Sequence, residues 1–444
     1  NQRRIVLIID AFLPPIELDS PIIVKEKKKE MNQRGIIHSK VSGKFEIVQE
    51  LPKNADTLEN IFNYADAFGQ IRFAYINNVA KIAPSPTKIE KSASAIGGEF
   101  GINTATYYGF GFHISAYLSQ NIHFLNPSKE NLNNDFVNTD NNSFVYIAEA
   151  SIDYSNDFFQ TKLGRIKVET PYADSDDIRM AANTFEGTWM NIDYTSALTT
   201  QIMFLKRWAG YDSQDVTVDK SQDKFKDLVS DNAFGMLIGS LTYEYSEKSE
   251  ISFWYSYIDK MSAISYAEII GIYFIDGRSF HVDYGIQASN ISELDNSGVA
   301  GDIIGAMSIL HYRGLFLGAS YNKAFVNDGR YIVDGFGGGP YYTSLDEASI
   351  SVISEASVGK DVESFRIGTG YNLKKTGINQ LQGYMLELVY GELYTKDEKI
   401  KEKDIILTYK ESKKINIEGI YTQFDSSYNS NTFNRTLLRI NYLF

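Results

Sequence analysis

The 444-residue chain has no cysteine, only 3 tryptophans and no run of eighteen apolar residues. The absence of cysteine argues against disulfide frameworks, thiolate metal sites and covalently attached haem. Because a transmembrane helix needs about 20 apolar residues in succession, no membrane-spanning helix is expected. A formal net charge of −13 disfavours a nucleic-acid-binding protein, since phosphate contacts require a basic surface.

Tyrosine is abundant where tryptophan is scarce. The chain contains 30 tyrosines, and aromatic residues make up 14% of it. A tyrosine with a buried ring and a hydrated hydroxyl suits the two interfacial girdles of a membrane β-barrel. A tyrosine-rich β-sandwich is the soluble alternative.

The last nine residues, 436–444, alternate in polarity. The apolar face comprises Leu438, Ile440, Tyr442 and Phe444, and the opposite face carries Arg439 and Asn441. A period of two predicts a strand with one face in lipid and the other in water. A chain that ends on such a strand is typical of an outer-membrane β-barrel, in which it would close against residues 67–77.

The same period continues from Phe68 onward, with charges of both signs on the inner face. Ile71, Phe73 and Tyr75 oppose Gln70, Arg72 and Ala74, and Tyr146, Ala148 and Ile152 are expected to oppose Glu149 and Ser151. Mixed charge indicates a wet lumen rather than the dry core of a sandwich. Eighteen strands are expected, beginning near residues 67, 94, 107, 143, 157, 185, 197, 232, 248, 264, 279, 301, 314, 362, 381, 402, 414 and 432.

The connections alternate in length, as in outer-membrane barrels with short periplasmic turns and long outer loops. Short turns are expected at 155–157, 276–278 and 313–314, and long loops at 120–142, 168–184, 209–231 and 326–361. An even number of strands places both barrel ends in the periplasm and leaves room for an aqueous pore. Residues 343–361 fit either a strand or a loop.

Residues 1–66 do not follow this pattern. They contain Pro14-Pro15 and the charged run Lys25–Glu30, and a short helix is expected with Asp56 as its N-cap. The apolar run Ile5–Ile9 is interrupted by Asp10 and has no clear cleavage site, so it is not assigned as a signal peptide. We therefore expect a periplasmic arm or lumenal plug over 1–66 and a transmembrane barrel domain over 67–444.

Several stretches, taken in order, resemble the OprD-like outer-membrane porin family, especially the Opr-family porins of epsilonproteobacteria. The resemblance covers 54–444, whereas 1–53 match nothing typical of the family. It rests on Asn54–Asn77, Lys162–Arg165, Thr170–Tyr172, Asp177–Arg179, Thr184–Gly187, Gly337–Ser344 and the terminal Phe444.

The resemblance implies an eighteen-stranded barrel in the bacterial outer membrane, surrounded by lipid and lipopolysaccharide. Loops three and seven would fold inward and form a constriction. Such porins mediate passive, selective diffusion of ions and small hydrophilic solutes, often carboxylate-bearing, along a row of lumenal arginines and lysines.

The candidate constriction residues carry both signs of charge. By strand parity Arg72, Arg207, Arg313, Arg366 and Arg439 point inward; Arg179 lies in the third loop, and the family counterpart of Arg165 lies beside the constriction. They face Asp174, Asp176, Asp177 and Glu186 of the third loop and Asp346 and Glu347 of the seventh. A field between the two signs would orient a dipolar solute. Alternatively, these charges pair with one another and hold the loops inside the barrel.

No cofactor is expected. Gly335–Gly339 lacks the Lys-Ser/Thr and helix of a phosphate-binding loop and suits tight loop packing instead. The oxygen-rich Asn133–Asn142 could hold Ca²⁺ weakly, although a polar outer loop is favoured. The five histidines have no metal-site spacing, and His281 with Asp283 is interpreted as isolated lumenal polarity.

There are two alternatives to a diffusion channel. A barrel enzyme is disfavoured because the chain has no Gly-x-Ser-x-Gly motif and no clustered His, Asp and Ser. A structural or interaction protein would use residues 1–66 to bind a periplasmic or outer-membrane partner. A homotrimer is common among porins, and no feature of this sequence demonstrates one.

Overall fold

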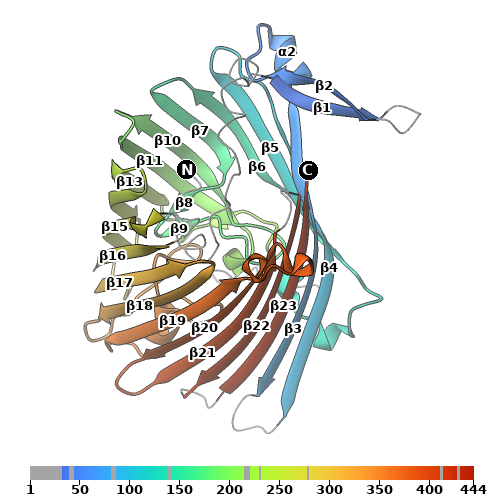
Figure 1. Cartoon of the computed structure of the whole chain (residues 1–444). Helices are drawn as coiled ribbons and strands as arrows, with labels where there is room; N and C mark the ends of the chain where they lie inside the picture. The colour runs from blue at the N-terminus through green and yellow to red at the C-terminus, as the bar shows by residue number, and fades with distance from the viewer. Residues whose placement is uncertain are drawn as a thin grey trace.

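The computed structural model describes residues 33–39, 45–81, 87–138, 142–214, 221–229, 232–277, 280–410, 414–427 and 431–444. They form a closed antiparallel barrel of eighteen strands, which confirms the expected fold (Figure 1). The barrel strands are β3 (Asp66–Lys81), β4 (Lys88–Asn103), β5 (Phe110–Asn121), β6 (Phe144–Ser155), β7 (Phe159–Ile166), β10 (Thr184–Asp193), β11 (Leu198–Ala209), β13 (Met236–Ser246), β14 (Ser249–Ile258), β15 (Ser262–Asp276), β16 (Phe280–Glu293), β17 (Gly301–Tyr312), β18 (Leu315–Phe325), β19 (Val362–Asn372), β20 (Tyr384–Tyr394), β21 (Lys399–Tyr409), β22 (Ile415–Ser426) and β23 (Asn431–Leu443).

The last strand closes the barrel against the first, as expected. β23 pairs with β3 in a register that places Leu438 opposite Tyr75. The backbone of Phe444 exchanges two 3.1 Å hydrogen bonds with Gly69. Ile440 is exposed on the lipid side, and Leu437 is buried on the lumenal side. The alternation in the sequence of β23 therefore distinguishes the lipid-facing side chains from the lumenal ones.

One predicted face assignment, on β6, is wrong. Tyr146 and Ala148 are buried and face the lumen together with Glu149, whereas Ile147 and Ile152 are exposed outside. The register with β5 shifts between Ser115 and Ala116, because β6 carries a bulge there. A bulge inserts one extra residue and exchanges the two faces beyond it, which period-two reasoning cannot anticipate.

The four longest connections all lie at one end of the barrel, and the connections at the other end are shorter than these. Numbering the connections at the long-loop end in chain order gives loop 2 (122–143), loop 3 (167–183), loop 4 (210–235) and loop 7 (326–361). These loops contain η2 (Lys129–Asn131), η3 (Asn134–Phe136), β8 (Glu169–Thr170), β9 (Ala173–Asp174), η4 (Asp212–Gln214), β12 (Lys226–Asp227) and α3 (Ile350–Ala356), and the turn after β19 contains η6 (Leu373–Thr376) and η7 (Asn379–Leu381). Within the ambiguous 343–361 segment the regular structure is α3.

Loops 3 and 7 fold into the lumen (Figure 1). Tyr172 of loop 3 shares a 2.7 Å hydrogen bond with Ser289 of β16, and Phe336 of loop 7 packs edge-on against Trp208 of β11 at 5.4 Å. Both loops belong to one buried apolar cluster with the wall from β10 to β21. Each large side chain buried there contributes roughly 1.5–3 kcal/mol, so apolar packing alone favours the inward position.

The segment before the barrel is attached to its short-turn end. β1 (Gln33–Ser39) and β2 (Phe45–Pro52) form a hairpin, and α2 (Leu58–Asn63) follows. The N-cap of α2 is Thr57 rather than Asp56, because the Thr57 side chain accepts from Asn60 N at 3.2 Å. The Ala105 amide donates to the Ile61 carbonyl, which ties α2 to the β4–β5 turn. Among the described residues, no helix is long or apolar enough to cross a membrane.

Candidate functional site

Arg72 on β3 holds loop 3 against the barrel wall. Its Nη1 and Nη2 donate to the two carboxylate oxygens of Asp177 at 2.6 and 2.7 Å, and Nη1 also donates to the Arg179 carbonyl at 2.6 Å. Asn441 on β23 accepts from Nε at 2.7 Å. Arg72 is only 2% exposed, whereas the Asp177 side chain is 34% exposed, so the arginine side of this bidentate pair is buried and fixes the position of loop 3.

Arg179 joins loop 3 to three other loops. Its Nε donates to Asp135 of loop 2 at 3.1 Å, and its Nη2 lies 3.5 Å from Glu347 of loop 7. Its guanidinium also lies 4.7 Å from the ring centroid of Tyr211 in loop 4, a cation–π contact. If one of these loops moved away, the buried guanidinium would lose a partner and remain as a poorly compensated charge. Arg179 therefore couples the positions of the four loops.

Two arginines on β23 contact the loops from the wall. Arg435 forms ion pairs with Asp346 and Glu347 of loop 7, and Arg439 pairs with Glu418 of β22 and donates to the Asp177 carbonyl. Arg435 was missed by the sequence analysis. It lies within the last strand, expected to begin near residue 432, and shares the inward parity of Arg439, so the same period of two would have found it.

Carboxylates of the wall hold loop 7 from the other side. The Glu347 amide donates to Glu402 of β21 at 2.9 Å, and Asp346 accepts from Thr422 of β22 at 2.5 Å. The carboxylate oxygens of Asp346, Glu402 and Asp404 lie within 4.8 Å of one another. The middle of loop 7 is therefore held in a mixed-charge contact, in which Arg435 offsets the charge of several carboxylates.

Loops 3 and 7 are joined by backbone as well as by charge. The Asp174 amide donates to the Phe336 carbonyl at 2.9 Å, and the Phe336 amide donates to the Tyr172 carbonyl at 3.0 Å. Gly335 has φ +86°, and a Cβ there would lie 2.4 Å from the Tyr172 carbonyl oxygen. The glycine-rich run permits this close approach, in agreement with the packing role expected for it.

Three predicted constriction residues form a separate cluster. Glu186 lies on β10 rather than in loop 3, where it pairs with Arg207 of β11 and lies 3.6 Å from Arg165 of β7. Phe185 and Trp208 are buried in the lumenal cluster, so their sequence neighbours Glu186 and Arg207 lie on the opposite face of β10 and β11. The Arg165 guanidinium lies 4.3 Å from the ring centroid of Phe225 in loop 4, and that ring packs beside the lumen-facing Tyr146 at 6.4 Å. The inward parity predicted for Arg207 is wrong because the β10–β11 register shifts between Glu186 and Gly187.

The inward position predicted for Arg313 from strand parity is also wrong. It lies in the exposed turn between β17 and β18 with φ +49°, and its guanidinium is 5.2 Å from the Tyr312 ring centroid. A residue in a tight turn does not follow the alternation of the strand before it. Arg366 faces the lumen from β19, as expected, where Asp404 of β21 and Glu387 of β20 act on it electrostatically.

Burial sets the charge of the loop 3 acids. Burial and the neighbouring Asp176 raise the pKa of Asp174 to about 8, and burial together with Asp212 raises the pKa of Asp176 to about 7. Burial also acts on Asp177, but the Arg72 guanidinium overcomes it and holds the pKa of that carboxyl below its usual value. Loop 3 thus combines a permanently ionised anchor with two acids that titrate near neutral pH.

A closed barrel of eighteen strands, narrowed by two inward loops fixed to a charged wall, defines a porin. The family model described as outer membrane porin, OprD family, matches residues 109–437, and the chain belongs to this family. It is an outer-membrane channel for the selective diffusion of small solutes and ions.

Solved porin structures share the fold at low sequence identity. OpdL of Pseudomonas aeruginosa is 14% identical with a TM-score of 0.67, over 86% of this chain and 98% of that one. OpdK of Pseudomonas aeruginosa with vanillate is 14% identical with a TM-score of 0.69, over 85% of this chain and 98% of that one. A BenF-like porin from Pseudomonas fluorescens Pf-5 is 13% identical with a TM-score of 0.71, over 86% of this chain and 99% of that one. No curated protein matches the sequence.

Proposed function

We propose that this channel selects small hydrophilic solutes that carry a carboxylate. The supporting observation is that the lumenal arginines come from one arc of the wall, β19 to β3. Three of them contact loop 3 or loop 7, and the fourth, Arg366, lies near the wall acids Asp404 and Glu387. The four arginines are Arg72, Arg366, Arg435 and Arg439. A field between opposite charges orients a dipolar solute, and the planar arginine fork suits two carboxylate oxygens. The solved OpdK structure contains vanillate, an aromatic carboxylate.

Current block by benzoate and by its neutral amide, benzamide, tests this proposal in planar bilayers. We expect benzoate to block the unitary current at a severalfold lower concentration than benzamide. Arg366→Gln should reduce this preference, and Arg313→Gln, which removes the same charge from an exposed turn, should leave it unchanged. Equal block by the two solutes in the unaltered protein would contradict a carboxylate preference.

We also propose that the cluster of Arg165, Glu186 and Arg207 contacts lipopolysaccharide phosphates. The guanidiniums of Arg165 and Arg207 both lie against the Glu186 carboxylate, and the two arginine side chains are 33% and 43% exposed. Two guanidiniums and one carboxylate leave a net positive charge, which favours binding of a phosphate group. Arg165→Gln/Arg207→Gln should weaken binding of lipopolysaccharide and leave binding of its dephosphorylated form unchanged; an equal loss for both would remove this role.

The remaining expectations stay predictions. They are the division into an arm or plug at 1–66 and a barrel at 67–444, a protein partner of the arm, a homotrimer, weak Ca²⁺ binding in Asn133–Asn142, and a closer relationship to epsilonproteobacterial porins. Residues 1–32 and 40–44 lie outside the described residues. Deleting residues 2–53 and comparing partner capture with conductance would separate an arm, whose loss removes capture, from a plug, whose loss raises conductance.

A further inference from the structure

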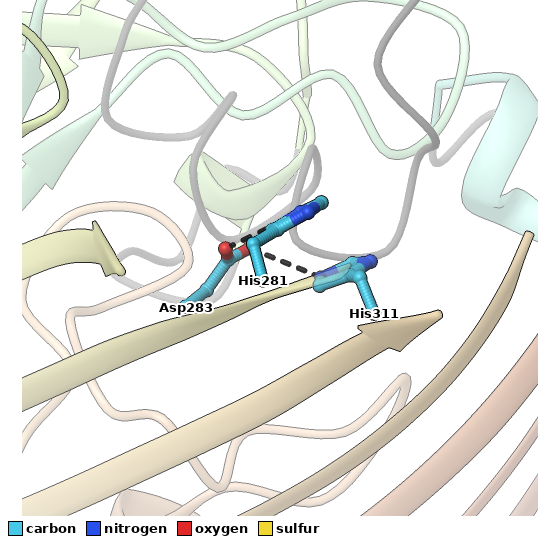
Figure 2. Close-up of side chains that lie close together, drawn as sticks. All are labelled: His281, Asp283 and His311. Carbon is cyan, nitrogen blue, oxygen red and sulfur yellow. Dashed lines mark hydrogen bonds and ion pairs between the residues drawn. The ribbon is translucent and has the colours of Figure 1, made fainter. Parts of the chain in front are cut away.

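Two histidines face each other across neighbouring strands of the lumen. His281 on β16 is paired with His311 on β17, and their rings stack at a centroid distance of 4.5 Å and an angle of 10°. Asp283 lies two residues beyond His281, so its side chain projects from the same face of β16 (Figure 2). The three side chains are separated by up to thirty positions in sequence and are assembled only by the strand register.

The carboxylate of Asp283 lies between the two imidazoles. His311 Nε2 is 3.1 Å from Asp283 Oδ2, and His281 Nε2 is 3.8 Å from Asp283 Oδ1 (Figure 2). All three side chains are at least nine-tenths buried. Within the described chain Asp283 Oδ1 accepts no hydrogen bond, although it is buried. A buried carboxylate oxygen without a donor is costly and therefore indicates a missing partner.

The chemistry of the three groups is that of a metal-ligand set. Their ligand atoms lie within 4.8 Å of one another. Two imidazole nitrogens and one carboxylate oxygen suit Zn²⁺ and similar divalent transition cations, which bind such atoms at about 2.0–2.2 Å. Tetrahedral bonds of that length separate neighbouring ligand atoms by about 3.3 Å. The His311–Asp283 pair already has this separation, and rotation of the His281 ring would bring its nitrogen closer.

We propose that His281, Asp283 and His311 bind one divalent transition cation at the periplasmic end of the lumen. Three protein ligands leave a fourth position open to water or to a solute with a donor atom. The site lies beside the β15–β16 and β17–β18 turns, away from the arginines of β3 and β23. Phe274 and Phe316 lie against the two imidazoles, at 5.7 and 6.1 Å, and give the ligands an apolar surround. This site is independent of the proposed carboxylate preference.

Calorimetric titration of the full-length protein in detergent with Zn²⁺ tests the proposal, with Mg²⁺ as the hard cation that prefers oxygen ligands. One equivalent of Zn²⁺ should bind the unaltered protein, and Mg²⁺ should not compete. His281→Gln and His311→Gln should each weaken this binding by about tenfold or more, whereas His123→Gln, in an exposed stretch of loop 2, should leave it unchanged. The Co²⁺ absorption spectrum of the same proteins should show the visible bands of a tetrahedral site, lost with either lumenal variant.

The barrel fold of each variant is checked by its heat-modifiable mobility in detergent gels, and its pore by single-channel conductance. Loss of the Zn²⁺ equivalent in a folded, conducting His311→Gln protein supports the assignment. If Zn²⁺ binding is absent in the unaltered protein, or survives unchanged in both lumenal variants, the cluster is a hydrogen-bonding group of the wall and the proposal is wrong.

Discussion

Arg72 on β3 and Asp177 in loop 3 form a bidentate ion pair, with contacts of 2.6 and 2.7 Å, across a separation of 105 residues. Arg439 donates to the Asp177 carbonyl from the neighbouring strand, so the junction between the first and last strands holds the tip of loop 3. Removal of Asp177 alone is costly, because the buried Arg72 guanidinium would lose its partner without regaining water. The two strands that close the barrel therefore also carry the arginines that hold loop 3.

Ion selectivity should change with pH through two acids of loop 3. A carboxyl with a raised pKa is neutral below that pKa and charged above it, and Asp174 and Asp176 have values of about 8 and about 7. Raising the pH from about 6 to about 9 should add up to two negative charges and increase cation preference in reversal-potential measurements. In Asp174→Asn/Asp176→Asn this change should disappear; an unaltered pH profile in that variant would assign the titration to other groups.

Gly335→Ala should weaken the contact between loops 3 and 7. The new Cβ would meet the Tyr172 carbonyl oxygen at 2.4 Å, and the residue would also carry the strain of φ +86°. Gly329→Ala is the matched control, because Gly329 lies in the same loop with φ +74° and a Cβ added there would have nothing within 4 Å.

Backbone strain of about 1–2 kcal/mol is common to both variants, so a difference between them measures the clash. Limited proteolysis of folded protein should cut loop 7 faster in Gly335→Ala than in Gly329→Ala. Equal rates would show that loop 7 does not depend on close backbone contact with loop 3.

Removing Phe444 should impair barrel closure. Its backbone makes both terminal hydrogen bonds to Gly69, and its ring lies 5.8 Å from that of Phe100 on β4. Deletion removes two ladder bonds worth roughly 1 kcal/mol each, together with the ring contact. The temperature at which the barrel unfolds in detergent gels should fall, whereas Phe444→Tyr should preserve it. An unchanged unfolding temperature after deletion would mean that closure is complete at Leu443.

The strands were predictable because lipid on one side and the lumen on the other impose a period of two along most of each strand. The expected starts at 301 and 362 coincide with those of β17 and β19. The inward positions of Arg72, Arg366 and Arg439 follow from the same period. It fails where a bulge exchanges the faces, as at Arg207, and where a strand ends, as at Arg313.

Apart from the closure of β23 against β3, the side-chain contacts between distant elements were not predictable from one sequence. The spacing of His281 and His311 in the chain gives no sign of a metal site, because the two residues meet only through the pairing of β16 with β17. The partners of Arg72 and Arg435 lie in loops whose inward course depends on apolar packing among distant residues. Sequence patterning therefore identified the wall and its charges, and the structure supplied their pairing.

Single-channel conductance of the Arg72→Ala and Asp177→Ala variants tests the central claim most directly. If the pair holds loop 3 in the lumen, either change frees the loop. Asp177→Ala leaves the buried Arg72 guanidinium unpaired, at a cost of about 3–5 kcal/mol, and Arg72→Ala leaves a carboxylate that is 34% exposed, at a smaller cost. Both variants should show a severalfold larger or strongly fluctuating unitary current, the double variant should resemble either single one, and Arg313→Ala should match the unaltered protein. Steady currents of unchanged size in all three loop variants, or no conductance from the folded unaltered protein, would contradict the account.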